Sequence, residues 1–183
     1  MAGYALLGAC IAGVYGIIHD QVTYTISFEY YTRVKFRQFT YADFGLPPRV
    51  FVGTIGFLAT WWVGLFVGWF QARILVPTTV PARVKVHVWR GIAMVFATAV
   101  IGGVVGWLWA EWTLSAKDTI WLVDWEFHFG LEHPRAFYRV ACIHNGGYLG
   151  ALVGFILALV NAWRHRGERE EVGDVAATGS SAC

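Results

Sequence analysis

The stretch VFVGTIGFLATWWVGLFVGWFQ, residues 50–71, decides how this chain folds. It contains no charged side chain, and it has the roughly 20 residues that an α-helix needs to cross the hydrocarbon core of a bilayer. Apolar stretches of comparable length occupy residues 2–22, 88–110 and 140–163. The sequence therefore predicts an all-α integral membrane protein, a bundle of four transmembrane helices within residues 1–166.

The composition of the whole chain agrees with a lipid bilayer as its main partner. Charged residues make up 14% of the chain and its mean hydropathy is +0.51. An ordinary soluble domain has about a quarter charged residues, so this chain has too few charges to cover a surface that faces water on all sides. The net charge of +2 and the lack of a basic run interleaved with aromatics predict no nucleic-acid partner.

Basic residues near the helix ends predict the orientation of the spans. The connection over residues 72–87 contains arginine and lysine but no acid, and Arg164, Arg166 and Arg169 follow the fourth span. Lys and Arg are enriched on the cytoplasmic side, so both termini are predicted to be cytoplasmic. The outer connections hold basic residues too, but these are mixed with acids. Residues 167–183 are polar and rich in small residues, which predicts a disordered cytoplasmic tail.

The two outer connections are both rich in aromatic residues, which favour the membrane interface. In the first, Ser27 is a suitable N-cap for a short interfacial helix over residues 28–38, and Glu29 lies near the positive end of its dipole. The second connection is expected to fold back on the membrane surface. Its Glu126 and His128 are interpreted as solvated residues of a strand, a loop or an interfacial helix.

Glycines at four-residue spacing predict seams where the spans pack. In lipid, helices associate through close contacts between small residues rather than through a hydrophobic drive. The seam glycines are Gly64 and Gly68 in the second span, Gly102 and Gly106 in the third, and Gly146, Gly150 and Gly154 in the fourth. Such seams serve packing within the bundle, self-association, or contacts with other membrane subunits.

Two histidines near the outer ends of the first and fourth spans are the strongest candidates for a functional site. Helical periodicity puts His19 on one stripe with Gly16 and Ala12, and His144 on one stripe with Gly147 and other small residues. A stripe of small residues is expected to face another helix, and both histidines lie at the same predicted depth. His19 and His144 are therefore expected to meet inside the bundle, where an ionisable residue is a functional candidate by default.

Two acids complete this predicted site. Asp20 adjoins His19, and Glu29 begins the short helix that can fold over the same end. The hypothesis is a transition-metal site of His19, Asp20, Glu29 and His144, because imidazole and carboxylate bind zinc, iron, copper and manganese. A haem between the two histidines has less support. The alternatives are a fastening role without chemistry and a proton-transfer site, and whether the protein is an enzyme stays open.

The residues that follow the first span also resemble a known family. Residues 19–39 read HDQVTYTISFEYYTRVKFRQF, which is similar to the signature HDQxTYTISxEYxTxxKFxQF of an uncharacterised family of small bacterial multi-span membrane proteins. The likeness continues at residues 56–62 and at His144 and Asn145. Members of that family tend to carry proline after the serine, where this chain has Phe28. The resemblance implies a bacterial inner-membrane protein and supports grouping the four site residues, and it implies no activity.

Three functions are consistent with these patterns. The favoured hypothesis is an inner-membrane protein with a polar, metal-binding site at the outer end of the bundle. The first alternative is a structural or accessory subunit of a larger membrane complex, because the ten tryptophans suit docking. The second is a small transporter or proton-conducting protein. It is the weaker of the two, since Thr54 and Thr60 are the only hydrogen-bonding side chains of the second span apart from its indoles and the terminal Gln71.

Overall fold

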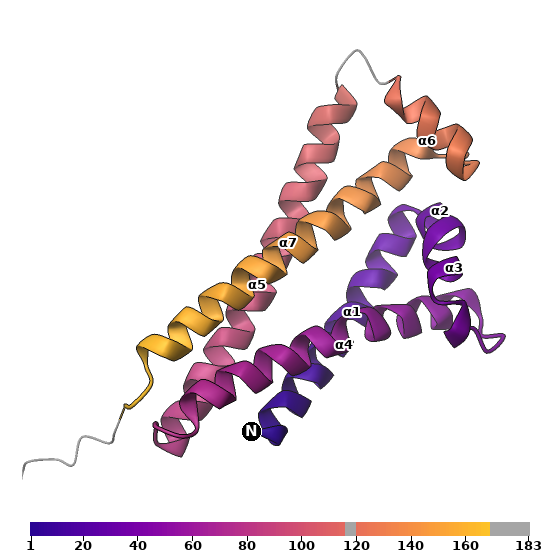
Figure 1. Ribbon diagram of the computed structural model, residues 1–183. Helices are drawn as coiled ribbons and strands as arrows, with labels where there is room; N and C mark the ends of the chain where they lie inside the picture. The colour runs from indigo at the N-terminus through magenta and orange to yellow at the C-terminus, as the bar shows by residue number, and fades with distance from the viewer. Residues whose placement is uncertain (116–119, 169–183) are drawn as a thin grey trace, which may run out of the picture.

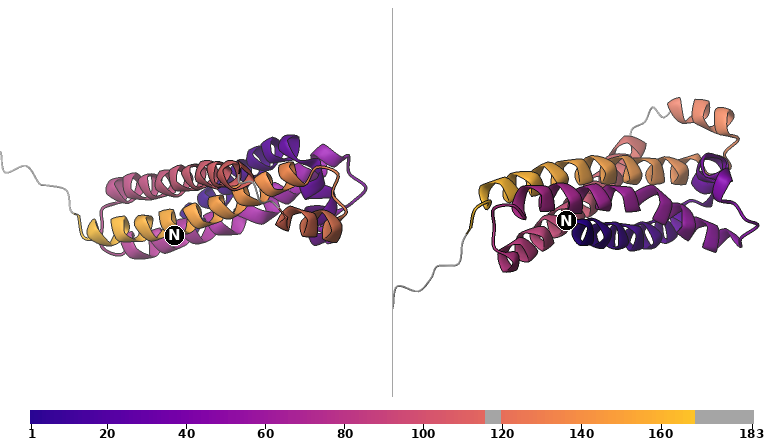
Figure 2. Two further views of the ribbon diagram at one scale, coloured as in Figure 1. Left: turned by 90° about the horizontal axis from the view of Figure 1, so that it is seen from above. Right: turned by 60° about the horizontal axis from the view of Figure 1, so that its bottom comes forward.

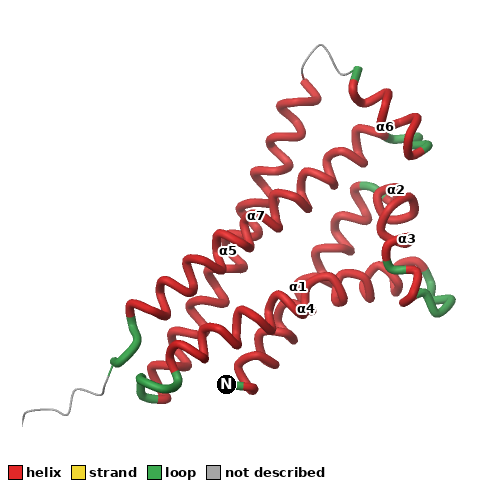
Figure 3. Tube along the Cα trace, viewed as in Figure 1, coloured by secondary structure: helices red, strands yellow, loops and turns green. Residues whose placement is uncertain are grey.

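The structure, a computed structural model, describes residues 1–115 and 120–168. The described residues form helices joined by short loops and contain no strand (Figure 3), which confirms the predicted all-α class. The four long helices are α1 (Ala2–Ile26), α4 (Pro48–Leu75), α5 (Pro81–Ser115) and α7 (Pro134–Arg164). By length and composition, each of them can cross a membrane.

Each long helix extends beyond the apolar stretch that predicted it. Prolines at the first turn begin α4 and α7, and Pro81 is the first residue of α5. Proline suits this position because its fixed φ is helical and it lacks an N–H that would have no partner there. Apolar side chains mark the part of a helix that lies in hydrocarbon, whereas helical backbone hydrogen bonding begins at these prolines, outside the apolar part. The helices are therefore longer than the predicted spans.

The long helices are arranged as two pairs of consecutive helices. In Figure 1, α1 crosses α4 obliquely, as α5 crosses α7, and these two pairs have the most extensive contacts. The chain begins at the same end of the bundle as the α4–α5 turn and the end of α7, and Figure 2 agrees. A core of aliphatic side chains joins the pairs toward this end: Val67, Leu75, Val84, Val88, Ile92, Val95, Ala158 and Ala162.

Each pair is closed by glycines whose backbones touch. Between α1 and α4, a Cβ added to Gly64 would overlap the carbonyl oxygen of Gly8. Between α5 and α7, Gly102 and Gly146 stand in the same relation, each against the carbonyl oxygen of the other. The predicted glycine seams are therefore confirmed as contacts within the chain, whereas self-association through them stays a prediction.

The connection between α1 and α4 folds over the end of the bundle opposite the α4–α5 turn. It contains α2 (Phe28–Tyr30), a π-helical turn η1 (Tyr31–Lys35), α3 (Phe36–Gln38) and a 3₁₀ turn η2 (Thr40–Ala42). Ser27 Oγ accepts a hydrogen bond of 3.3 Å from the Tyr30 amide, as predicted for the cap. The π turn interrupts the single helix expected over residues 28–38. It changes which side chains face inward, and both Tyr31 and Lys35 are buried.

The second connection contains one described helix, α6 (Trp121–Phe129). This resolves the alternatives for Glu126 and His128, which lie on a helix with both side chains exposed. Figure 1 shows α6 at the same end as α2 and α3. Of the predicted disordered tail, residues 169–183 lie outside the described residues.

Candidate metal centre

Helices α1 and α7 bring the two predicted histidines together at the end covered by α2 and α3, here called the His19 end. The ring centroids of His19 and His144 are 4.8 Å apart. His144 Nε2 lies 3.4 Å from Asp20 Oδ1, and one ligand atom from each of the three residues lies within 4.8 Å of the others. The expectation that the two small-residue stripes carry the histidines to one place is confirmed.

The ionisable groups of this cluster are removed from solvent. Asp20 is 5% exposed and His144 is 4% exposed, because both project from packed faces of their helices. A buried carboxylate without a compensating cation or hydrogen bond loses far more hydration energy than a neutral side chain does. The Tyr31 hydroxyl interacts with the Asp20 carboxylate, but Oδ2 has no hydrogen-bond partner. The charge of Asp20 is therefore only partly compensated, and a cation bound beside it would lower the cost of its burial.

The hydrogen bonds of His144 fix its tautomer. Its Nδ1 lies 2.9 Å from the carbonyl oxygen of Val140, one turn earlier in α7. A carbonyl oxygen only accepts, so Nδ1 carries the proton, and in the neutral ring Nε2 holds a lone pair. This Nε2 faces Asp20 without a hydrogen-bond partner, and Asp20 Oδ2 also has none. The lone pair of Nε2 therefore faces Asp20 Oδ1 at 3.4 Å, and these two electron-rich atoms repel each other unless a proton or a cation lies between them.

Three tyrosines surround the histidines. Tyr30 stacks on His144 with a centroid distance of 4.8 Å, and Tyr15 meets His19 edge-on at 5.6 Å. The Tyr31 hydroxyl lies 2.6 Å from Thr23 Oγ1. Burial raises the pKa of the Tyr30 and Tyr31 hydroxyls, and the charge of Asp20 raises both further. These tyrosines surround the two imidazoles with aromatic rings.

Lys35 is a functional candidate that sequence reasoning missed. Its side chain is 5% exposed, and Nζ donates to the Tyr148 hydroxyl at 3.3 Å and lies over the ring of Phe39. It forms no ion pair with any carboxylate of the described residues. The family signature in residues 19–39 contains this lysine, but the regular helix expected over residues 28–38 does not direct it inward. The π-helical turn η1 does direct it inward.

Glu29 was predicted as a fourth ligand, and the structure gives it other partners. Its two carboxylate oxygens accept hydrogen bonds of 2.7 Å from the amides of Glu132 and His133. These amides immediately precede α7, where helix N-terminal N–H groups lack intrahelical acceptors. Glu29 is therefore engaged in joining the first connection to the second, and the group of candidate ligands comprises His19, Asp20 and His144.

A large cavity lies between the two helix pairs and reaches the cluster. Its volume is about 1000 Å³, and His19, Asp20, His144 and Lys35 line its polar end. The rest of its wall is mainly apolar and includes Phe66, Phe70, Phe96, Phe155, Trp62 and Leu152. Because Trp62, Phe66 and Leu152 are also exposed on the outside of the protein, the cavity opens on the surface that would face lipid.

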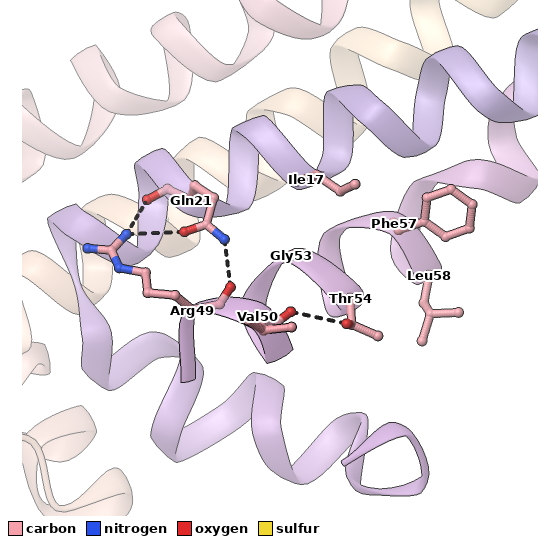
Figure 4. Close-up of a pocket in the computed structure, with 8 residues that line it drawn as sticks. All are labelled: Ile17, Gln21, Arg49, Val50, Gly53, Thr54, Phe57 and Leu58. Atoms are coloured by element: carbon pink, nitrogen blue, oxygen red, sulfur yellow. Dashed lines mark hydrogen bonds between the residues drawn. The ribbon is translucent and has the colours of Figure 1, made fainter. Parts of the chain in front are cut away.

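A second hollow of about 650 Å³ lies against α1 and α4 near residues 49–58. Figure 4 shows its polar groups paired with each other. Gln21 Nε2 donates to the Arg49 carbonyl oxygen at 2.7 Å, and Arg49 Nη1 donates to Gln21 O and Oε1, each at 3.2 Å. Arg49 also lies over the ring of Tyr24. These contacts hold the end of α1 against the start of α4, so Gln21 and Arg49 serve the packing of the two helices.

The chemistry at the His19 end is thus two imidazoles and one carboxylate at the polar end of an apolar cavity. Such a set suits a divalent transition metal and leaves coordination positions for another ligand. Comparison of the chain with protein-family models, curated proteins and solved structures finds no match. The geometry of the described residues therefore carries the functional conclusion, and the resemblance to the bacterial family stays a prediction.

Proposed function

We propose that this protein is a bacterial inner-membrane protein that binds a divalent transition metal through His19, Asp20 and His144. The observation that carries the proposal is the buried Nε2 of His144, which faces Asp20 Oδ1 at 3.4 Å and has no hydrogen-bond partner. A metal ion between these atoms would replace their repulsion by two bonds. The Nδ1–H bond to the Val140 carbonyl then orients the ring, as outer partners of metal-bound histidines commonly do.

The distances are compatible with one ion after a small adjustment. Metal bonds to histidine nitrogen and carboxylate oxygen are about 2.0–2.2 Å long, so the ligand atoms of one metal lie about 3–3.5 Å apart. The three ligand atoms lie within 4.8 Å of one another. His19 lines the cavity, and its ring forms no hydrogen bond with the described residues, so rotation of this side chain can close the remaining gap.

The ligand that completes the coordination would come from the cavity. Its apolar wall suits a lipid-soluble molecule, and Lys35 at its polar end favours an oxygen that carries negative charge. The three protein ligands leave open positions on the metal. A molecule with an apolar body and an oxygen-bearing head therefore fits both ends of this space.

We further propose that both termini are cytoplasmic and that the His19 end faces the periplasm. The ends of α4 and α5 that adjoin their connecting turn carry Arg73, Arg83 and Lys85. This turn lies at the end of the bundle where the chain begins, and arginine and lysine favour the cytoplasmic side. Reporter fusions at residue 1 and within residues 76–80 should both give the cytoplasmic signal. A periplasmic signal from either fusion would refute this orientation.

Metal analysis of purified variants tests the proposed site. The full chain, purified in mild detergent without chelator or polyhistidine tag, should contain metal that His144→Ala and Asp20→Asn each lower by about one ion per chain. His128→Ala is the matched control, because His128 is exposed on α6, and its metal content should equal that of the unchanged chain. Equal metal content in all four proteins, with or without reloading, would refute the proposal.

A further inference from the structure

A second cluster of histidine and carboxylate side chains lies at the opposite end of the bundle. His87 lies in α5, His165 directly follows α7, and Glu168 comes one turn later. One ligand atom from each of the three lies within 4.8 Å of the others. Nothing in their spacing along the chain groups these three residues, and the basic residues around His87 and His165 bear only on the predicted orientation of the spans.

The geometry of this cluster is close to that of a metal site. His87 Nε2 lies 3.0 Å from Glu168 Oε2, and His165 Nε2 lies 4.0 Å from Glu168 Oε1. The two imidazole rings stack with a centroid distance of 4.3 Å and an angle of 26°. His87 is 2% exposed, whereas His165 and Glu168 are each 34% exposed, so one side of the cluster is accessible to water.

Hydrogen bonds leave two nitrogen atoms of the cluster without a partner that suits them. His165 Nδ1 lies 2.8 Å from the Asn161 carbonyl oxygen and must donate to it. The lone pair of its Nε2 then faces the Glu168 carboxylate, the same relation that His144 has to Asp20. His87 Nδ1 is buried and has no hydrogen-bond partner, so the ion pair with Glu168 satisfies only one of its two nitrogens.

The backbone of the segment after α7 is fixed where it delivers Glu168. The Gly167 amide donates to Thr79 Oγ1 at 3.0 Å, and the Val80 amide donates to the Glu168 carbonyl oxygen at 3.3 Å. Gly167 has a φ of +85°, which other residues rarely adopt. Contacts with the α4–α5 turn thus hold the carboxylate beside His87, and the hydrogen bond from His87 lowers the pKa of Glu168.

We propose that His87, His165 and Glu168 bind a second divalent transition metal, and that this metal is Zn²⁺. Two imidazole nitrogens and one carboxylate oxygen are ligands that Zn²⁺ takes with water in the fourth position. The exposed side of His165 and Glu168 gives that water, and the ion itself, access from the aqueous phase. This site shares no ligand with the cluster at the His19 end and does not depend on it.

Zinc titration of the full chain in detergent tests this site separately. The background carries His19→Ala and His144→Ala, which disable the first cluster, and it has no polyhistidine tag. After chelator treatment and its removal, calorimetric titration with Zn²⁺ alone should find about one site per chain. Loss of an outer partner of a metal ligand costs about 10–100-fold in affinity, so His165→Ala and Glu168→Gln should each weaken binding by at least ~100-fold.

His165 and Glu168 are the residues to replace because they are partly exposed, whereas the buried His87 contributes to packing. His128→Ala in the same background is the control and should bind Zn²⁺ with unchanged affinity. Zn²⁺ should also raise the melting temperature of the background protein and leave that of the Glu168→Gln variant unchanged. Absence of Zn²⁺ binding by the background protein, or equal affinity in all variants, would overturn the proposal, whatever the result at His19.

Discussion

Replacing Glu29 by glutamine should destabilise the fold while leaving the metal at the His19 end in place. The buried Glu29 carboxylate accepts two hydrogen bonds of 2.7 Å, from the Glu132 and His133 amides. Glutamine offers one acceptor, and its NH₂ would face the other amide. A lost bond to a charged group or a buried N–H without a partner costs about 1.5–3 kcal/mol. We therefore expect the free energy of unfolding to fall by about 3 kcal/mol.

Thermal unfolding in detergent, followed by tryptophan fluorescence, measures this effect. A loss of that size corresponds to a melting temperature lower by roughly 6–12 °C for a chain of this length. The control is Glu132→Gln, the same chemical change on an exposed side chain, which should leave the melting temperature within about 1 °C. An unchanged melting temperature in Glu29→Gln would show that Glu29 does not stabilise the fold. Loss of metal in this variant would show that Glu29 is a ligand. Either result would refute the assigned role.

Three further predictions concern stability and titration. Gly64→Ala should lower the free energy of unfolding by about 3 kcal/mol, because the new Cβ overlaps backbone of α1. The control Gly3→Ala, with open space around it, should not lower it. Equal melting temperatures of the two variants would refute the role of Gly64 in the contact between α1 and α4. Gln21→Ala should cost about 1 kcal/mol by breaking the clasp to Arg49, measured by the same melts. The Tyr31 hydroxyl should stay protonated well above the ordinary tyrosine pKa of 10.0. Because the unfolded chain ionises first, the fold loses stability as the pH rises above 10.0. Absorbance titration should therefore show late-titrating tyrosines, Tyr30 and Tyr31 among them, and Tyr31→Phe should remove one of them; an unchanged titration curve in this variant would refute the assignment.

The fold and the meeting of the two histidines could be predicted because both follow from regular helices. The four long helices were evident from apolar length alone, and His19 and His144 meet because a helical repeat fixes which residues share a face. The seam glycines were found in the same way. Where a helix is regular, the spacing of two residues along the sequence determines whether their side chains point to the same face.

The parts that could not be predicted depend on irregular backbone or on distant segments. Lys35 turns inward because of a π-helical turn that has no signature in residue spacing. Glu29 bonds to amides more than a hundred positions later in the chain, and nothing in its local sequence identifies them. The cluster of His87, His165 and Glu168 forms only where the chain after α7 returns to the α4–α5 turn, a contact that the positions of basic residues do not reveal.

The pairing of consecutive helices has a consequence for how the two proposed sites behave. Each pair is a helical hairpin held by its own glycine contacts, so each can enter the membrane as a unit before the two hairpins dock. His19 and Asp20 belong to the first hairpin and His144 to the second, whereas His87, His165 and Glu168 all belong to the second and its extension. Metal at the first site would therefore join the two hairpins, and the occupancy of this site would depend on the angle between them. Metal at the second site would join α5 to the segment after α7 within one hairpin and would not bridge the two hairpins.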